Sequence, residues 1–117
     1  MNAPIKSLTD VGHVDDIPAR GARVVKLAET EIGVFRTLDD RIFAIENRCP
    51  HRGGPLSEGI VHGHFVTCPL HNWVISLETG EAQGADEGCV RTIPVEVGEG
   101  DRLLLDLAAL LARKDAA

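Results

Sequence analysis

The sequence predicts an all-β fold, a compact antiparallel sandwich or barrel in a single domain, from three observations. Short runs of β-branched and apolar residues recur along most of the chain, and turn residues close each run. Only residues 108–114 have a helical pattern, and that segment is too short to be stable alone. The length of 117 residues is enough for one hydrophobic core. We therefore expect one domain over residues 1–117, with a short C-terminal helix.

The predicted strands follow one another closely, as expected for antiparallel neighbours. They are expected at residues 23–27, 31–36, 41–45, 59–61, 64–67, 73–77, 90–97 and 102–107. Asp39-Asp40 and His62-Gly63 are the turn signals of two hairpins. In the last strand Leu103, Leu105 and Leu107 alternate, which predicts one buried face.

Charge and hydropathy exclude several classes of partner. Twelve Lys and Arg against eighteen Asp and Glu give a net charge of −6, which disfavours nucleic acid and anionic membranes. No window approaches the roughly 18 consecutive apolar residues of a membrane span. The first six residues lack the apolar stretch of a signal peptide, and three Cys residues do not suggest a disulfide framework. We expect a cytoplasmic protein.

Two loops, at about 47–57 and 68–73, interrupt the β pattern, and each carries one Cys and one His. The candidate ligands are Cys49 and His51 in the first loop and Cys68 and His71 in the second. Two thiolates and two imidazoles offered by short loops predict a four-point metal site. A structural zinc site uses the same ligand types, although its ligands are more often spaced by two to four residues.

The spacing of these ligands resembles the motif of the Rieske family: Cys-x-His, sixteen residues, then Cys-x-x-His. The prolines after each Cys and the Gly53-Gly54-Pro55 run also fit that family. The resemblance implies one [2Fe–2S] cluster per chain and transfer of single electrons. It further implies that Cys49 and Cys68 hold the inner iron, and His51 and His71 the outer iron.

The surroundings of the motif predict a reduction potential near the low end of the Rieske range of about −150 to +300 mV. High-potential members of the family place a Ser two residues after the second His and a Tyr nearby, whereas this chain has Trp73 at that position and no Tyr. In the loop at 83–89, Asp86 and Glu87 lower the potential further unless water screens them. Trp73 is expected to fill the core beneath the second loop, or alternatively to shield the cluster.

Four further Cys and His residues are not expected to be ligands. Cys89 is left without a Cys partner and is predicted to be a buried free thiol. The remaining histidines, His13, His62 and His64, have no Cys at ligand spacing and are predicted to face solvent.

Residues 68–75, 79–82, 84–88 and 90–95 resemble the small subunit of assimilatory NAD(P)H nitrite reductase. In that family the large subunit carries flavin, an iron–sulfur cluster and sirohaem, and reduces nitrite to ammonia. The sequence has no Ser/His/Asp grouping, phosphate loop or Gly-x-Gly-x-x-Gly motif, so we expect an electron-transfer subunit without a substrate site. The alternative is a free Rieske ferredoxin that carries electrons from a reductase to a ring-hydroxylating dioxygenase.

Overall fold

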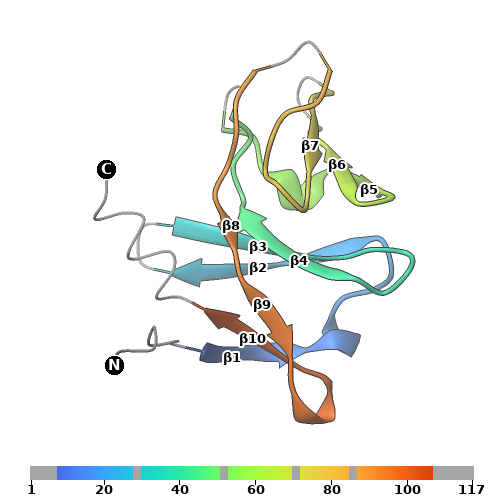
Figure 1. Cartoon of the computed structure of the whole chain (residues 1–117), viewed down its shortest axis with the longest axis vertical. Coiled ribbons are helices and arrows are strands. Elements are labelled where there is room, and N and C mark those ends of the chain that lie inside the picture. The colour runs from blue at the N-terminus through green and yellow to red at the C-terminus, as the bar shows by residue number, and fades with distance from the viewer. Residues whose placement is uncertain (1–7, 28–29, 51–52, 70–71, 85–86, 107–117) are drawn as a thin grey trace, which may run out of the picture.

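Three antiparallel sheets make up the computed structural model, which describes residues 8–27, 30–50, 53–69, 72–84 and 87–106 (Figure 1). The lower sheet contains β1 (Leu8–His13), β10 (Arg102–Asp106) and β9 (Val95–Val97). The middle sheet contains β2 (Gly21–Leu27), β3 (Thr30–Arg36), β4 (Ile42–Glu46) and β8 (Thr92–Ile93). The upper sheet contains β5 (Ile60–His62), β6 (Phe65–Thr67) and β7 (Val74–Ser76). Three short 3₁₀ helices, η1 (Val14–Asp16), η2 (Leu56–Glu58) and η3 (Glu99–Asp101), lie in the connections.

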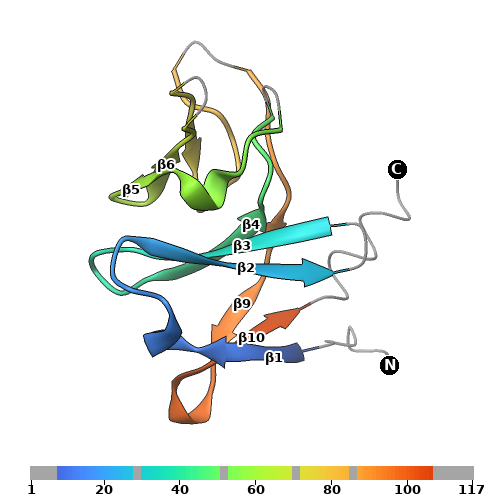
Figure 2. The same cartoon turned by 180° about the vertical axis from the view of Figure 1, so that it is seen from behind.

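The all-β prediction is confirmed, with differences at two strands. The predicted strand at 90–97 is divided at Pro94 into β8, which pairs with β4, and β9, which pairs with β10. Proline has no N–H for a ladder, and here the chain passes from the middle sheet to the lower one (Figure 2). Strand β1 was not predicted, because its sequence is mostly polar and its partner β10 lies at the other end of the chain.

The strands β3 and β4 of the middle sheet are buried on both faces, and the sheet divides the core into two layers. Neighbouring residues of a strand point to opposite faces, and so Val34 packs in the lower layer while Phe35 packs in the upper one. Ala44 and Ile45 are divided in the same way. Leu103 and Leu105 are fully buried in the lower layer, as their alternation predicted. Leu107 and the helix predicted at 108–114 lie outside the described residues.

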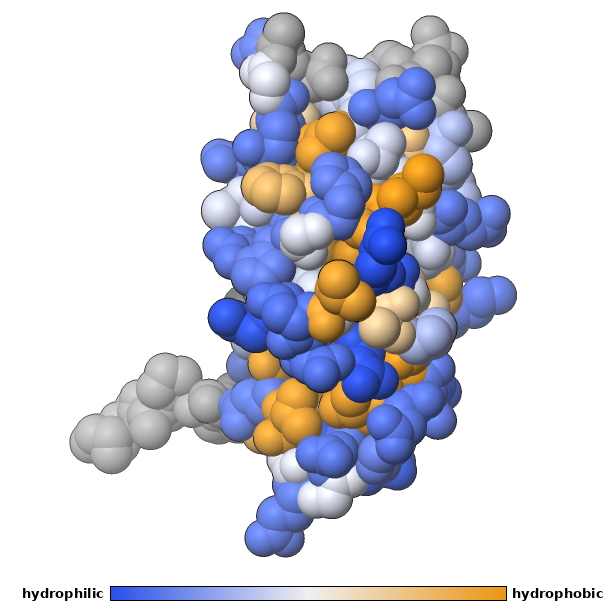
Figure 3. All heavy atoms as spheres, turned by 90° about the vertical axis from the view of Figure 1, so that its right-hand side faces the viewer, coloured by the Kyte–Doolittle hydropathy of each residue, from blue (hydrophilic) through white to orange (hydrophobic). Residues whose placement is uncertain are grey.

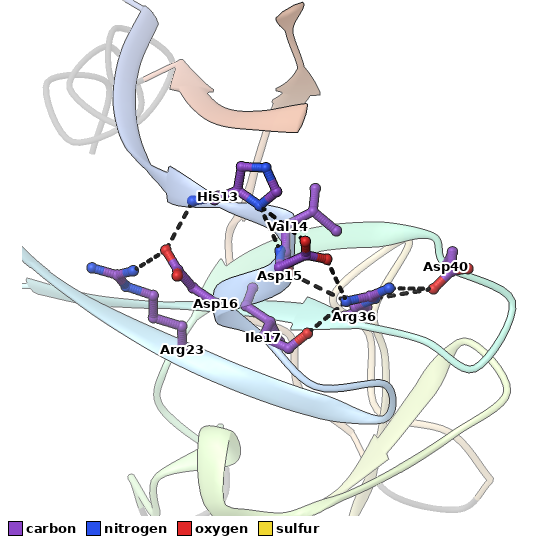
Figure 4. Close-up of polar contacts among 8 residues, drawn as sticks. All are labelled: His13, Val14, Asp15, Asp16, Ile17, Arg23, Arg36 and Asp40. Carbon is purple, nitrogen blue, oxygen red and sulfur yellow. Dashed lines mark hydrogen bonds and ion pairs between the residues drawn. The ribbon is translucent and has the colours of Figure 1, made fainter. Parts of the chain in front are cut away.

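A polar network around η1 ties the lower sheet to the middle one (Figure 4). The guanidinium of Arg36 donates to the carbonyl of Ile17 at 2.9 Å and forms an ion pair with Asp40 at 3.0 Å. The Nδ1 atom of His13 accepts the backbone N–H of Asp15 at 2.9 Å and caps η1. His13 therefore has a structural role at the end of the molecule away from the two Cys-His loops.

Among the described residues, no helix is long and apolar enough to cross a membrane. The large apolar side chains exposed in this part of the chain are those of Leu8, Val24, Leu38, Ile60 and Val97. On the face drawn in Figure 3, polar and charged side chains separate the apolar groups. Scattered exposed apolar residues are usual on hydrated protein surfaces.

Candidate metal centre

The two loops that carry Cys49 and Cys68 share one pattern of backbone hydrogen bonds. In the first loop the N–H of Cys49 donates to the carbonyl of Gly54 at 2.8 Å, and the carbonyl of Cys49 accepts the N–H of Gly53 at 2.8 Å. These two bonds close the first loop between Cys49 and the residues four and five positions later. His51 lies within this closed turn in the sequence, but outside the described residues.

The second loop repeats this arrangement. The N–H of Cys68 donates to the carbonyl of Trp73 at 2.7 Å, and the carbonyl of Cys68 accepts the N–H of Asn72 at 3.1 Å. Asn72 has a φ of 59°, and the corresponding Gly53 of the first loop has a φ of 75°. Asn and Gly are the residues that adopt this left-handed conformation most readily. His71 lies between Cys68 and Asn72 in the sequence and, like His51, is not among the described residues.

Cys49 and Cys68 are buried in the upper core layer, at 3% and 1% exposure. A thiolate in such a position needs a compensating positive charge, because burial of an unpaired charge is costly. Iron supplies that charge, and soft thiolate ligands suit iron–sulfur clusters. The two cysteines therefore fit the predicted group. No three His, Cys, Asp or Glu side chains of the described segments are placed to hold a metal ion, and the predicted set includes two histidines outside those segments.

The segment after the first loop packs directly against the start of the second. A Cβ atom at Gly59 would lie 2.2 Å from the carbonyl oxygen of Thr67, which immediately precedes Cys68. Leu56 of η2 is fully buried in the same layer as both cysteines. The relative position of the two Cys-bearing loops is therefore set by the packing of η2 and β5 on β6.

A third loop, residues 83–89, approaches both Cys-His loops. A Cβ at Gly88 would lie 2.9 Å from Cβ of Pro50 and 3.6 Å from Cζ3 of Trp73, so only a glycine fits there without displacement. Trp73 is partly buried and packs against the upper core layer, as its predicted role in the core requires. Its alternative role as a shield of the cluster stays a prediction. Glu87 is exposed, and Asp86 lies outside the described residues.

The prediction of a buried Cys89 was wrong. Cys89 is a free thiol, as expected, but it is exposed. It forms a β-bridge with Glu81 at the base of the third loop, and the next residue, Val90, turns into the core instead. The alternation of side chains along extended backbone thus directs residue 89 outward.

His62 and His64 lie at the turn between β5 and β6. The exposed His62 contacts the hydroxyl of Thr67 at 2.7 Å. His64 is a partly exposed turn residue, close to the prediction, but it also forms two contacts that were not predicted. Its Nε2 atom lies 3.0 Å from Asp39 in the β3–β4 turn, and its Nδ1 atom 2.9 Å from Glu78 after β7. His64 therefore links the upper sheet to the β3–β4 turn.

We expect the contribution of His64 to stability to decline as the pH rises. The hydrogen bonds that His64 donates to Asp39 and then to Glu78 raise the pKa of His64, since each carboxylate favours the protonated ring. The stabilisation is therefore complete below the unfolded-state pKa of about 6.5 and is lost as the pH rises through the higher folded-state pKa. The measurement is the difference in thermal midpoint between the native protein and His64→Gln from pH 5.5 to 9. A constant difference, or the same trend for His62→Gln, would contradict this assignment.

Sequence reasoning did not identify the polar residues at the base of the first loop. Glu46 accepts the Arg91 guanidinium at 2.9 Å and the Arg91 backbone N–H at 3.0 Å. Burial raises the pKa of Glu46, but the hydrogen bonds from Arg91 outweigh this effect and hold the pKa below its usual value. Next to Glu46, the side chain of Asn47 is buried and bonds to two other segments. The only local signal was the three polar residues, Glu46 to Arg48, between the apolar part of β4 and Cys49.

Comparison with known proteins identifies one family. A model of the Rieske [2Fe–2S] domain matches residues 7–94. The anthranilate 1,2-dioxygenase ferredoxin subunit of Burkholderia cepacia is 38% identical over 87 residues, which cover 74% of this chain and 76% of that protein. Two further relatives, each 30% identical, are ferredoxin components of naphthalene 1,2-dioxygenase systems, from a Ralstonia species and from Pseudomonas aeruginosa.

Solved structures of two kinds share the fold. One is the ferredoxin of carbazole 1,9a-dioxygenase from Nocardioides aromaticivorans, with a TM-score of 0.76 and 25% identity, covering 85% of this chain and 96% of that one. Another is described as an NADH-dependent nitrite reductase small subunit from Mycobacterium tuberculosis, with a TM-score of 0.78 and 23% identity, covering 87% and 96%. The two scores are nearly equal, so the fold does not distinguish the two kinds of protein.

Proposed function

Because this chain belongs to the Rieske [2Fe–2S] domain family, we propose that it is the electron-transfer small subunit of an NAD(P)H nitrite reductase. Members of the family hold a Rieske [2Fe–2S] cluster, and Rieske-type electron transfer is the activity of this chain. The proposed ligands are Cys49, His51, Cys68 and His71. The bound cluster supplies one-electron oxidation and reduction.

The chain's own residues would keep the cluster in a largely apolar setting. The backbone N–H and carbonyl of Cys49 and of Cys68 are each hydrogen-bonded within their loop, and both cysteines are buried in one core layer with Leu56. At Gly88 the third loop packs on Pro50 and Trp73. This packing restricts the access of water from that side. Low solvent exposure is one of the factors that sets a cluster's potential.

The observation that carries the nitrite reductase assignment is the packing of Gly88 against Trp73. The segments 68–75 and 84–88, which resemble the nitrite reductase small subunit in sequence, meet at this contact. Their resemblance therefore concerns a connected surface beside the proposed cluster and not isolated positions. A partner that docks over the cluster would contact this surface.

A second candidate function is that of a ferredoxin for a dioxygenase. It is favoured by sequence identity, since several relatives at 30–38% identity are ferredoxin components or subunits of dioxygenase systems. In that case the partners would be an oxygenase and its reductase. The same cluster ligands would serve both functions.

Purification from the natural host with a tag on the chromosomal copy separates the two functions. We expect a large subunit with flavin and sirohaem to copurify, and we expect the complex to oxidise NAD(P)H when nitrite is added. The exposed Cys89 supplies the matched control: Cys89→Ser should retain this activity and Cys68→Ser should lose it. Copurification of an oxygenase, without nitrite-dependent oxidation, would instead identify the chain as a dioxygenase ferredoxin.

A further inference from the structure

Asn47 is a buried polar residue at the base of the first Cys-His loop, with 8% exposure. It directly follows β4 and precedes Cys49 by two positions. Buried amides are normally fully hydrogen-bonded, because leaving one unpaired costs free energy. The partners of Asn47 therefore show what its amide does.

The side chain of Asn47 connects three segments. Its Oδ1 atom accepts the backbone N–H of Ser57 in η2 at 2.6 Å. Its Nδ2 atom donates to the carboxylate of Glu31 in β3 at 3.3 Å, and its backbone N–H donates to the Glu31 carbonyl at 2.9 Å. The amide of Asn47 is thus hydrogen-bonded to β3 through its nitrogen and to η2 through its oxygen.

The bond to Ser57 closes the first loop at its ends. Residues 48–56 lie between the two bonded positions and include Cys49 and, in the sequence, His51. The adjacent Leu56 is fully buried and fixes η2 in the core. The Asn47 amide consequently fixes the two ends of the first loop, at the end of β4 and at η2, relative to each other.

We propose that Asn47 is a positioning residue for the electron-transfer centre, which orients the ligands of the first loop by clamping the loop's two ends together. The proposal rests on the ligand set given above. Residues that orient metal ligands affect both metal retention and the electronic properties of the metal. A residue that only stabilises the fold affects neither of these beyond its effect on unfolding.

Thr37 offers a matched control at the opposite end of β4. It is fully buried, and its Oγ1 atom accepts the N–H of Arg41 at 3.0 Å, so it also closes a connection with a side-chain hydrogen bond. Thr37→Ala removes a side-chain hydrogen bond that closes the β3–β4 turn, whereas Asn47→Ala removes one that closes the first loop. Both changes leave the Cys and His residues intact.

The test compares the anaerobically purified holoproteins by EPR of the dithionite-reduced state and by the rate at which visible absorption is lost. Each rate is measured at the same interval below the variant's own unfolding midpoint. We expect Asn47→Ala to shift the g-values and to lose the cluster about ten- to a hundredfold faster. Thr37→Ala should retain the native g-values and rate.

A donor–acceptor exchange provides the rescue. In Asn47→Asp combined with Glu31→Gln, the new carboxylate still accepts the Ser57 N–H, and the new amide of residue 31 donates to it. We expect this double variant to recover the native g-values and retention, whereas Asn47→Ala does not. If Asn47→Ala yields no folded holoprotein, Asn47→Ser replaces it, because its shorter hydroxyl does not reach the Ser57 amide.

Native g-values and cluster retention in Asn47→Ala would overturn the positioning role. Equal changes in Asn47→Ala and Thr37→Ala would also overturn it, since they would indicate a loss of general stability. Cys49→Ser measured alongside tests the ligand set separately. A cluster retained in Cys49→Ser would overturn that ligand set, while native behaviour of Asn47→Ala beside a cluster-free Cys49→Ser would overturn the positioning role alone.

Discussion

Replacement of Cys49 or Cys68 by Ser is expected to abolish the [2Fe–2S] cluster. A hydroxyl is a harder and far less acidic ligand than a thiol, and it suits iron–sulfur clusters poorly. Both cysteines are almost completely buried, so no nearby solvent replaces the missing ligand. We expect iron and sulfide per chain to fall close to zero, together with the visible absorption and the EPR signal of the reduced protein.

The same substitutions should also reduce thermal stability. The cluster joins two loops, and a cross-link that closes a loop of this length contributes about 3 kcal/mol to the free energy of unfolding. We therefore expect the midpoint to fall by about 12 °C or more. Cys89→Ser is the control, because Cys89 is exposed and free. A full EPR signal in Cys49→Ser or Cys68→Ser, or its loss in Cys89→Ser, would contradict the assignment.

The parts of the fold that follow from local sequence were predictable. The hairpin of β3 and β4 was predicted because two apolar runs flank the Asp39-Asp40 turn. Strand β1 was not, since it depends on pairing with β10 and on an ion pair of Asp10 with Arg102 at 2.9 Å, far along the chain. Such non-local partners leave no periodic signal in the strand itself.

In the candidate site, too, the features that depend on local sequence were predictable, and those that depend on distant partners were not. Cys49 and Cys68 were predicted from their spacing, and both are buried in one core layer beneath the loops. The contacts of His64 and Asn47 were not predictable, because their carboxylate partners come from other strands and turns. Ligation by Cys49, Cys68, His51 and His71 stays a prediction, as does the low reduction potential. Both concern residues or interactions outside the described structure.

Gly80 provides the second large effect, because the chain that returns from the third loop passes directly beside it. A Cβ at Gly80 would lie 2.2 Å from the carbonyl oxygen of Val90, and the Gly80 carbonyl accepts the N–H of Val90 at 2.8 Å. Val90 is itself buried in the layer that contains both cysteines. A side chain at position 80 must therefore displace Val90 and, with it, the base of the third loop.

Gly84 allows the steric effect to be separated from backbone strain. Gly80 and Gly84 have nearly the same φ, 79° and 72°, but a Cβ at Gly84 would meet nothing within 4 Å. Gly84→Ala should lower the free energy of unfolding by about 1–2 kcal/mol, the cost of a left-handed conformation for a residue with a Cβ. Gly80→Ala should cost a further 1–3 kcal/mol, roughly, from overpacking.

The third loop also packs on Pro50 and Trp73 through Gly88, so a displaced Val90 should loosen the cover over the cluster. We therefore expect Gly80→Ala to speed the bleaching of the holoprotein in air, while Gly84→Ala affects mainly the thermal midpoint. Equal midpoints and equal bleaching rates for the two variants would mean that the return of the chain past Gly80 does not constrain the third loop. Since the two glycines have nearly the same φ, a difference in bleaching rate between Gly80→Ala and Gly84→Ala measures how strongly the position of Val90 affects the packing of the third loop on the two Cys-bearing loops.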